Sequence, residues 1–378
     1  MRRNNINLYV AILLAVAIIF SFLTIYAFGE HKSDAISLSA RSAVLYQPEN
    51  DVFLFSKDAE SRLPMASTTK IMTALIAIEQ CDMSEIVEID DSAIGVEGSS
   101  AYLKKGDVLT MEELLYALLL QSANDAAVAI ACHISGDIGS FSTLMNDRAR
   151  KMELSDTSFD NPHGLDSEGH YTTARDLAII ASVALKNDCF LKIVSTYKKT
   201  FATEERSRTY VNHNKLLWMY DGCIGVKTGF TKKSGRCLVA AAERDGLRFI
   251  TVTLDAPSDW SDHTKMLDYG FDSLERIRLS KGFDHIYKIP VIGGINSELT
   301  VANTDDRYVI IPRNGAAVEE QIKLVRYVIA PIYRGEILGE IIYTQNGKEL
   351  ARVPLVSTED MKTKSKTGLF SKILSIFD

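Results

Sequence analysis

The most hydrophobic segment of the chain lies near its N-terminus, at residues 8–28. These 21 residues carry no charge, and all but two of them are apolar. A helix of this length, with a rise of about 1.5 Å per residue, extends roughly 30 Å and matches the hydrocarbon core of a membrane. Arg2 and Arg3 precede the segment, and such basic residues keep the N-terminus inside while the rest of the chain crosses. We therefore expect residues 1–30 to be a cleaved signal peptide or an N-terminal membrane anchor.

Between residues 34 and 270, segments with the hydrophobic period of a helix are mixed with segments typical of strands. The strand segments are rich in Val, Leu and Thr, and several helical segments begin at a residue that can cap them. We predict strands at 39–46, 52–55, 235–243 and 248–255, and helices at 71–79, 111–120, 126–134 and 173–185. This mixture predicts an α/β domain of residues 34–270, with a sheet flanked by helices.

The pattern changes to short strands after residue 275. We predict strands at 308–311, 322–329, 336–343 and 350–356. The clearest turn between them is Asn346-Gly347, a pair that favours a tight hairpin. We expect residues 275–357 to form a small all-β domain, joined to the first domain near residues 271–279. No cluster of chemically reactive residues lies in it, which favours the role of a spacer.

The last residues, 358–378, combine lysines with a helical hydrophobic stripe. Lys362, Lys364 and Lys366 lead into it, and its apolar positions fall on one helix face: Leu369, Phe370, Ile373, Leu374 and Phe377. A short amphipathic helix beside lysines suits the anionic surface of a membrane. The alternative is a last helix packed on the body of the protein.

Composition and charge argue against two classes of protein, nucleic-acid-binding proteins and proteins with a cysteine-rich zinc motif. The net charge is −7; residues 1–3 contribute +2 and residues 362–378 contribute +3, which leaves −12 for residues 4–361. An acidic body without a basic stripe argues against nucleic acid as a partner. Five cysteines cannot all pair, and no C-x-x-C spacing indicates zinc. We expect them to be small core residues, with one disulfide between Cys223 and Cys237 as the alternative.

A serine and a lysine three positions apart open the predicted helix at 71–79. If Ser67 sits at the start of this helix, Lys70 lies one turn on and on the same face. A serine hydroxyl is a weak nucleophile until a base takes its proton, and a lysine can act as that base once burial or a second cation lowers its pKa. This S-x-x-K motif alone is weak, because a serine cap followed by a lysine is common.

Two further motifs follow the S-x-x-K motif along the chain, and the three together are more specific than the first alone. Ser122-Ala123-Asn124 lies on a short connection between two predicted helices. Lys227-Thr228-Gly229 lies beside a predicted strand. The set S-x-x-K, S-x-N and K-T-G is close to that of penicillin-binding proteins and class A β-lactamases.

The chain resembles the low-molecular-mass penicillin-binding proteins that are D-alanyl-D-alanine carboxypeptidases. Beyond the three motifs, the resemblance rests on residues 161–166 and 170–178 and on residues 212–217, which look like signatures of that family. It implies a penicillin-binding/β-lactamase-like catalytic domain with an antiparallel sheet, followed by an all-β domain and a membrane-associated C-terminus. It implies no cofactor and no metal.

The resemblance assigns the chemical steps to three residues. Ser67 would attack the carbonyl between two terminal D-alanines and form an acyl-enzyme, Lys70 would act as general base, and Ser122 would relay the proton to the leaving nitrogen. The loop residues His163 and Asp166 are expected to have structural roles rather than chemical ones.

The resemblance also assigns the binding groups. Asn124 would hold the substrate amide and orient Lys70, while Lys227 and Thr228 would bind the terminal carboxylate. Gly229 would let the substrate lie close to the strand, and the backbone N–H groups of Ser67 and Phe230 would form the oxyanion hole.

The expected function is therefore a serine-type carboxypeptidase that trims peptidoglycan stem pentapeptides ending in D-Ala-D-Ala and is acylated by β-lactams. It would work at the extracytoplasmic face of the bacterial membrane. A β-lactamase, a DD-endopeptidase on the same fold and an inactive wall-binding protein are the alternatives. One departure from the family concerns residues 256–263, where many members place an arginine near the substrate carboxylate and this chain has none.

Overall fold

The computed structural model describes residues 36–202 and 206–364, so the predicted N-terminal segment and most of the predicted C-terminal helix lie outside the described residues. The chain divides into two compact units. The first runs to Asp268 without Asp245–Leu247, and the second contains those three residues and the chain from Tyr269. In the described part, no single helix is long and apolar enough to span a membrane; one pair, Asn124–Ser135 with Ile138–Lys151, passes that test only together and is bent by 84°.

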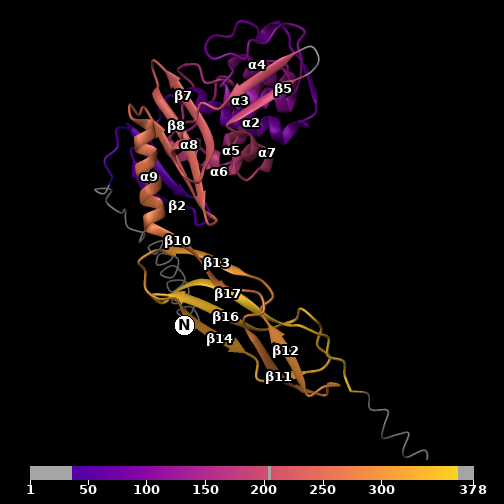
Figure 1. Cartoon of the computed structure of the whole chain (residues 1–378). Helices are drawn as coiled ribbons and strands as arrows, with labels where there is room; N and C mark the ends of the chain where they lie inside the picture. Colours follow the sequence, from indigo (N-terminus) through magenta and orange to yellow (C-terminus); the bar gives the residue numbers. More distant parts are fainter. Residues whose placement is uncertain (1–35, 203–205, 365–378) are drawn as a thin grey trace, which may run out of the picture. The chain divides into compact units, whose positions relative to one another are not determined.

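The first unit is built on a sheet of five strands within its described residues (Figure 1). The order is β2-β1-β9-β8-β7, and β1 pairs antiparallel with β2 and with β9, as β7 does with β8. β1 and β9 are almost entirely buried, as expected for central strands covered on both faces. The strands are β1 Ser42–Gln47, β2 Val52–Lys57, β7 Cys223–Thr231, β8 Gly235–Arg244 and β9 Leu247–Leu254.

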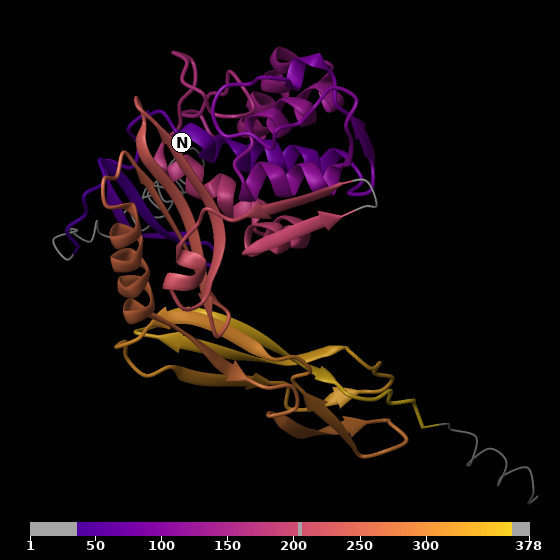
Figure 2. The same ribbon diagram turned by 45° about the horizontal axis from the view of Figure 1, so that its top comes forward.

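Helices cover both faces of this sheet (Figure 2). Helix α9 lies on one face, where the His263 ring contacts the hydroxyls of Thr251 and Thr253 on β9. Helices α2 to α7 gather on the opposite side with two short hairpins, whereas Tyr220, directly after α8, donates to Asp268 of α9 at 2.9 Å. The bounds are η1 Ala66–Thr69, α2 Lys70–Gln80, β3 Ile86–Glu88, η2 Asp91–Ala93, β4 Val108–Thr110, α3 Met111–Leu120, α4 Asn124–Ser135, α5 Ile138–Lys151, α6 Ala174–Ala184, α7 Asp188–Val194, β5 Lys198–Ala202, β6 Ser207–Val211, α8 Leu216–Met219 and α9 Asp259–Ser273.

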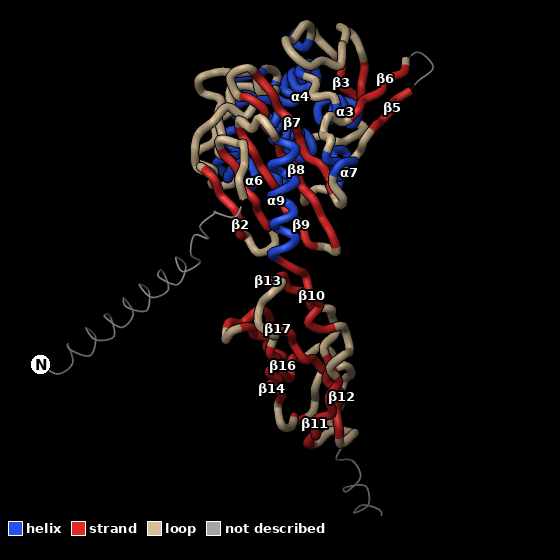
Figure 3. Tube along the Cα trace, turned by 60° about the vertical axis from the view of Figure 1, so that its left-hand side comes forward, coloured by secondary structure: helices blue, strands red, loops and turns tan. Residues whose placement is uncertain are grey.

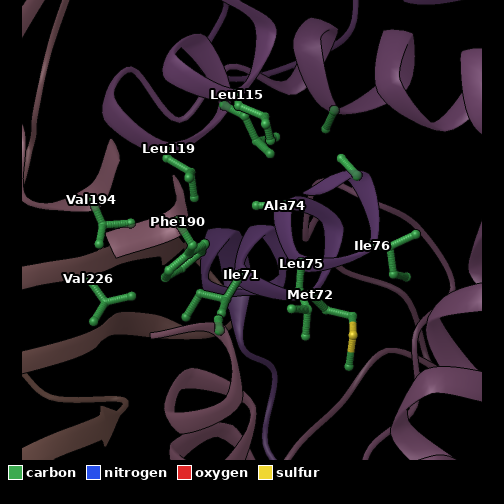
Figure 4. Packing of buried hydrophobic residues seen from close by; sticks show 14 of the residues in the cluster. Ile71, Met72, Ala74, Leu75, Ile76, Leu115, Leu119, Phe190, Val194 and Val226 are labelled. Carbon is green, nitrogen blue, oxygen red and sulfur yellow. The ribbon is translucent and has the colours of Figure 1, made fainter. Parts of the chain in front are cut away.

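Helix α2 forms the centre of the core. Its residues from Lys70 to Ala77 are all buried, which is typical of a helix enclosed on every side rather than one lying at a surface. Figure 4 shows its side chains among those of α3, α7 and β7. The labelled residues are Ile71, Met72, Ala74, Leu75, Ile76, Leu115, Leu119, Phe190, Val194 and Val226. The first turn of α2 is thereby held in a fixed place.

After the last residues of α9, the second unit consists of strands and turns in its described residues (Figure 3). One sheet has the order β14-β16-β17-β12-β11-β15, and β10 pairs with β13. Asn346 and Gly347, both at positive φ, make the turn between β16 and β17. The bounds are β10 Leu274–Ser280, β11 Ile286–Ile292, β12 Glu298–Ala302, β13 Arg307–Pro312, β14 Glu319–Leu324, β15 Val328–Ile329, β16 Ile337–Gln345 and β17 Lys348–Ser357.

The predicted fold class is confirmed, but several details differ. The strand expected at 322–329 is two strands, β14 and β15, at opposite edges of the sheet. No glycine or proline marks the break between them. Cys223 lies opposite Ala242 and Cys237 opposite Gly229, so the two cysteines do not face each other, and all five thiols are free.

Candidate active site

Ser67 and Lys70 meet at the start of the central helix. Ser67 lies in the 3-10 turn η1 and is partly exposed, while Lys70 is the first residue of α2 and is completely buried. Lys70 Nζ stands 3.0 Å from Ser67 Oγ, within hydrogen-bond distance. The sequence prediction that both side chains lie on one face thus holds, and the amine can reach the hydroxyl proton directly.

Two further acceptors fix the Lys70 amine. Nζ donates to Asn124 Oδ1 at 2.6 Å and to the His163 carbonyl oxygen at 2.6 Å. Burial lowers the pKa of Lys70 well below its ordinary value, and the charge of Lys227 lowers it further. A buried amine next to a second cation favours its neutral form, and a neutral amine has the lone pair that a general base needs.

Ser122 lies on the tight connection between α3 and α4, and Asn124 is the first residue of α4. Both are buried, and Ser122 has a positive φ of 60°. The Asn124 backbone N–H donates to the Ser99 carbonyl at 2.7 Å, and its side-chain amide donates to the Glu97 carbonyl at 2.5 Å. Because the amide nitrogen is engaged there, its oxygen points to Lys70. The orienting role of Asn124 in catalysis stays a prediction.

Lys227 lies on β7, the edge strand of the sheet in the described residues. Its side chain is only 1% exposed, and Nζ donates to the Thr228 carbonyl at 2.9 Å. Burial lowers the pKa of Lys227 to about 7. Within residues 36–202 and 206–364, no carboxylate forms an ion pair with Lys227, so its amine is available to pair with an anionic ligand.

Glycines allow three backbone segments to approach at the serine. A β-carbon on Gly229 would lie 3.0 Å from the Ser67 backbone nitrogen. A β-carbon on Gly164, whose φ is +91°, would lie 1.9 Å from the Ala66 carbonyl oxygen. The next residue on β7 after Gly229, Phe230, is 64% exposed. The predicted purpose of Gly229 was room for substrate, and the structure adds a second purpose, the packing of β7 on the serine turn.

The backbone is strained on both sides of the site. Ala66, immediately before Ser67, has φ +47°, and Ser122 has φ +60°. Left-handed conformations of residues other than glycine cost energy and persist where the surrounding structure imposes them, often at functional sites. The strain coincides with the two serines that the sequence motifs single out.

The loop at residues 160–171 supports the site, as expected of His163 and Asp166. Thr231 Oγ1 donates to Asp166 at 3.0 Å, which ties the loop to the end of β7. His170 Nε2 lies 2.7 Å from Thr69 Oγ1, and its Nδ1 accepts from the Asp160 backbone N–H at 3.0 Å. Burial lowers the pKa of His170 to about 4, so the ring is neutral and serves as scaffold.

The sequence motifs do not identify the groups that accept hydrogen bonds from Asn124 and Lys70. Three of these groups are the backbone carbonyls of Glu97, Ser99 and His163, and no residue pattern in a sequence predicts a contact with a distant carbonyl. A further group, Asp125, holds the adjoining loop rather than Asn124 or Lys70: its carboxylate accepts from the hydroxyl of Ser100 and the backbone N–H groups of residues 101 and 103. Its position next to Asn124 was the available signal.

Comparison with known proteins gives the same family along the chain. The D-alanyl-D-alanine carboxypeptidase family, peptidase family S11, matches residues 29–258, and the C-terminal domain of penicillin-binding protein 5 matches residues 279–363. The D-alanyl-D-alanine carboxypeptidase DacF of Bacillus subtilis is 35% identical over 344 residues, covering 88% of each chain. DacC of Escherichia coli is 30% identical over 380 residues, covering 94% of this chain and 92% of that relative.

Solved structures agree. Penicillin-binding protein 5 from Haemophilus influenzae is 27% identical with a TM-score of 0.64, covering 86% of this chain and 98% of that chain. The Streptomyces K15 DD-transpeptidase is 35% identical with a TM-score of 0.60, covering 62% of this chain and 98% of that chain. The resemblance inferred from the motifs is confirmed. Since the family match spans more than half of the chain and the relatives align along most of it, the chain belongs to the D-alanyl-D-alanine carboxypeptidase family of penicillin-binding proteins.

Proposed function

We propose that this protein removes the terminal D-alanine from peptidoglycan stem peptides through an acyl-enzyme on Ser67. Ser67 Oγ attacks the carbonyl carbon between the two D-alanines while its proton passes to the neutral Lys70 amine. The tetrahedral adduct collapses, the C–N bond breaks, and the leaving nitrogen receives a proton through Ser122. Water then attacks the ester, with Lys70 again taking the proton, and releases the shortened peptide. The observation that carries this proposal is the contact of a fully buried amine, 3.0 Å away, with a partly exposed serine.

The specificity for a free C-terminus follows from Lys227 and Thr228. Burial disfavours the charged form of Lys227, because the ammonium group loses its hydration. The terminal carboxylate of the substrate stabilises that charged form through a charge-assisted hydrogen bond. Asn124 holds the substrate amide on the opposite side. The backbone N–H groups of Ser67 and Phe230 bind the oxyanion, and the loss of one such donor typically costs about 10²–10³ in rate.

The decisive experiment is mass spectrometry of the protein incubated with penicillin. We expect one adduct, on the peptide containing Ser67, and none in Ser67→Ala. Ser56→Ala, an exposed serine of β2, is the control and should be labelled normally. Release of D-alanine from a pentapeptide by Ser67→Ala would refute the nucleophile. Rapid loss of the wild-type adduct as hydrolysed penicillin would favour a β-lactamase, and cleavage of cross-linked muropeptides would favour an endopeptidase.

We also propose that the protein acts at the extracytoplasmic face of the membrane, held by its terminal segments. Beside the apolar segment at 8–28, support comes from the place where the described chain ends. The Lys364 backbone N–H donates to the Gly293 carbonyl at 2.8 Å, so the last described residue lies near Ile292 and Ile295, which are 54% and 56% exposed. Exposed isoleucines beside lysines suit the surface of an anionic bilayer.

Sedimentation with vesicles tests this membrane contact. The full chain, extracted in detergent and mixed with vesicles containing anionic lipid, should bind more tightly than to neutral vesicles. Ile292→Ser together with Ile295→Ser should weaken binding, whereas Ile286→Ser, at the other end of β11 and 57% exposed, should not. Equal binding of all these variants to neutral and anionic vesicles would contradict the contact.

A further inference from the structure

A second cluster of reactive side chains lies outside the active site. Cys81 directly follows α2, Glu85 directly precedes β3, and His133 is in the last turn of α4. The cysteine sulfur, a glutamate carboxylate oxygen and a histidine ring nitrogen lie within 4.8 Å of one another. None of the three takes part in the proposed reaction, and two separate segments of the chain bring them together: the turn of residues 81–85 between α2 and β3, and the last turn of α4.

The backbone around the cluster is fixed by hydrogen bonds, so the side chains are presented from a defined frame. The Glu85 N–H donates to the Asp82 carbonyl at 3.0 Å, and the Met111 N–H donates to the Glu85 carbonyl at 2.9 Å. The Glu85 carboxylate oxygen lies 2.8 Å from His133 Nε2. Both side chains are still reachable from solvent, with 41% of Glu85 and 25% of His133 exposed.

We propose that Cys81, Glu85 and His133 bind a zinc ion. Thiolate sulfur, imidazole nitrogen and carboxylate oxygen are the three ligand types that zinc takes from proteins, at about 2.0–2.3 Å, which places ligand pairs roughly 3.3–3.6 Å apart. Atoms already within 4.8 Å reach that spacing by rotation of partly exposed side chains. On binding, Cys81 loses its thiol proton to solvent, and the bond between Glu85 and His133 is replaced by two bonds to the metal.

The fourth ligand of the ion is water. A polar hollow of about 80 Å³ adjoins the cluster, lined by Glu88, Asp90, Ala129, Cys132 and His133. This space accommodates a water molecule with polar partners. The spacing of the cysteines carries no zinc signal, because the cluster holds one cysteine, and His133 lies 48 positions after Glu85.

The position of the cluster gives the metal a structural purpose. Helices α2 and α4 pack against each other, and at their N-terminal ends Lys70 and Asn124 share the 2.6 Å hydrogen bond of the active site. Cys81 and His133 stand at the opposite ends of the same two helices. An ion there cross-links α2 and α4 about 16 Å from Lys70 along a helix of 11 residues. It therefore holds together the two helices that carry the base and the asparagine, without entering the reaction.

Titration with metal tests the site. The full chain is purified in detergent under reducing conditions, freed of metal and titrated with Zn²⁺ by calorimetry and with Co²⁺ by absorption. We expect one ion per chain, a thiolate-to-cobalt charge-transfer band, and a melting temperature that rises by several degrees with zinc. Cys81→Ser and His133→Gln should each weaken zinc binding at least tenfold and abolish the melting shift.

Two controls keep the result interpretable. Cys189→Ser changes a partly buried cysteine on α7 and should bind zinc like the wild type. Penicillin labelling of Ser67 should be preserved in Cys81→Ser, which shows that the variant is folded and that this test is independent of the proposed reaction. A wild type that binds no zinc, a cobalt spectrum without a thiolate band, or equal affinity in Cys81→Ser would overturn the site.

Discussion

Lys70 and Asn124 are 54 positions apart in the sequence and share a hydrogen bond of 2.6 Å between Nζ and Oδ1. Each is the first residue of a buried helix, α2 and α4 respectively. The S-x-x-K and S-x-N motifs thus meet at one point because two helices begin side by side. The relative position of these helix starts determines whether the amine faces Ser67.

Replacement of the lysine amine should remove acylation without unfolding the protein. Lys70→Met keeps the length and the apolar stem of the side chain and removes the base, so we expect acylation by a fluorescent penicillin to slow by about 10²–10⁴. The measurement is the second-order acylation rate constant, with a melting curve to show that the variant is folded. Lys192→Met, an exposed lysine of α7, is the control. Acylation of Lys70→Met within threefold of wild type would mean that another group takes the proton.

The pH profile of D-alanine release should be a bell with an unusual alkaline limb. Lys227 must be cationic to bind the carboxylate, and burial lowers its pKa from 10.5 to about 7, so kcat/KM should fall as pH rises, with a midpoint well below 10.5. Lys70 must be neutral to act as base, so kcat/KM should also fall at low pH, where Lys70 becomes protonated. Because the pKa of Lys70 is lowered, this acid limb should lie well below the ordinary pKa of a lysine. This profile reports the free enzyme.

A matched substrate separates the two limbs. The same peptide with a C-terminal amide does not need the cation of Lys227, so its release rate should lack the alkaline limb and keep the acid one. If both peptides lose kcat/KM at the same alkaline midpoint, the limb does not come from the carboxylate contact.

Local patterns were enough to predict many helices of the first unit. The helix predicted at 111–120 is α3 at the same residues, because Thr110 caps it by accepting from the Glu113 N–H and apolar residues fill its faces. Helices α5 and α9 were not predicted. Both are rich in polar residues, and α9 buries polar groups such as Asp262 and His263 that only tertiary partners can satisfy.

The motifs located the side chains of the candidate active site, but not the contacts that position them. Lys70 and the His163 carbonyl are 93 positions apart, and no spacing rule connects a lysine to a distant backbone oxygen. The same applies to Cys81, Glu85 and His133, whose proximity depends on the packing of α2 against α4. The strand β11 was missed because its exposed hydrophobic residues, Ile286 and Ile292, blur the alternation that marks a half-buried strand. β12 was missed although Leu299 and Val301 alternate with polar residues, because the strand has only five residues.

The contact of Gly164 with the serine turn can be tested with a pair of glycines. Gly164→Ala puts a β-carbon 1.9 Å from the Ala66 carbonyl oxygen at a φ of +91°, so the turn that holds Ser67 must move. Gly106→Ala has a similar φ of +78° but nothing within 4 Å. Both should lose about 1–2 kcal/mol of stability from the left-handed backbone, and only Gly164→Ala should also lose penicillin acylation, by tenfold or more. Equal acylation rates in the two variants would show that the turn does not depend on this contact.

The protein should lose stability in mild acid because buried histidines must stay neutral. His263 is fully buried between the hydroxyls of Thr251 and Thr253, and burial lowers its pKa from 6.5 to about 3. Below pH 6.5 the unfolded chain binds a proton that the folded chain does not, so stability falls as pH decreases from 6.5 towards 3. Between pH 6.5 and 5 this single group costs about 2 kcal/mol.

Urea unfolding at pH 7.5 and at pH 5 measures this loss. His263→Gln should be less stable than wild type at pH 7.5, because its hydrogen bonds fit less well, yet lose less stability on acidification. Val252→Ala, a fully buried change in β9, should lower stability at both pH values by the same amount, since it removes packing and no titrating group. If His263→Gln kept the full pH dependence of the wild type, the acid sensitivity would have to come from other groups. The next residues to replace would be His163 and His170, because burial lowers their pKa values to about 3 and about 4.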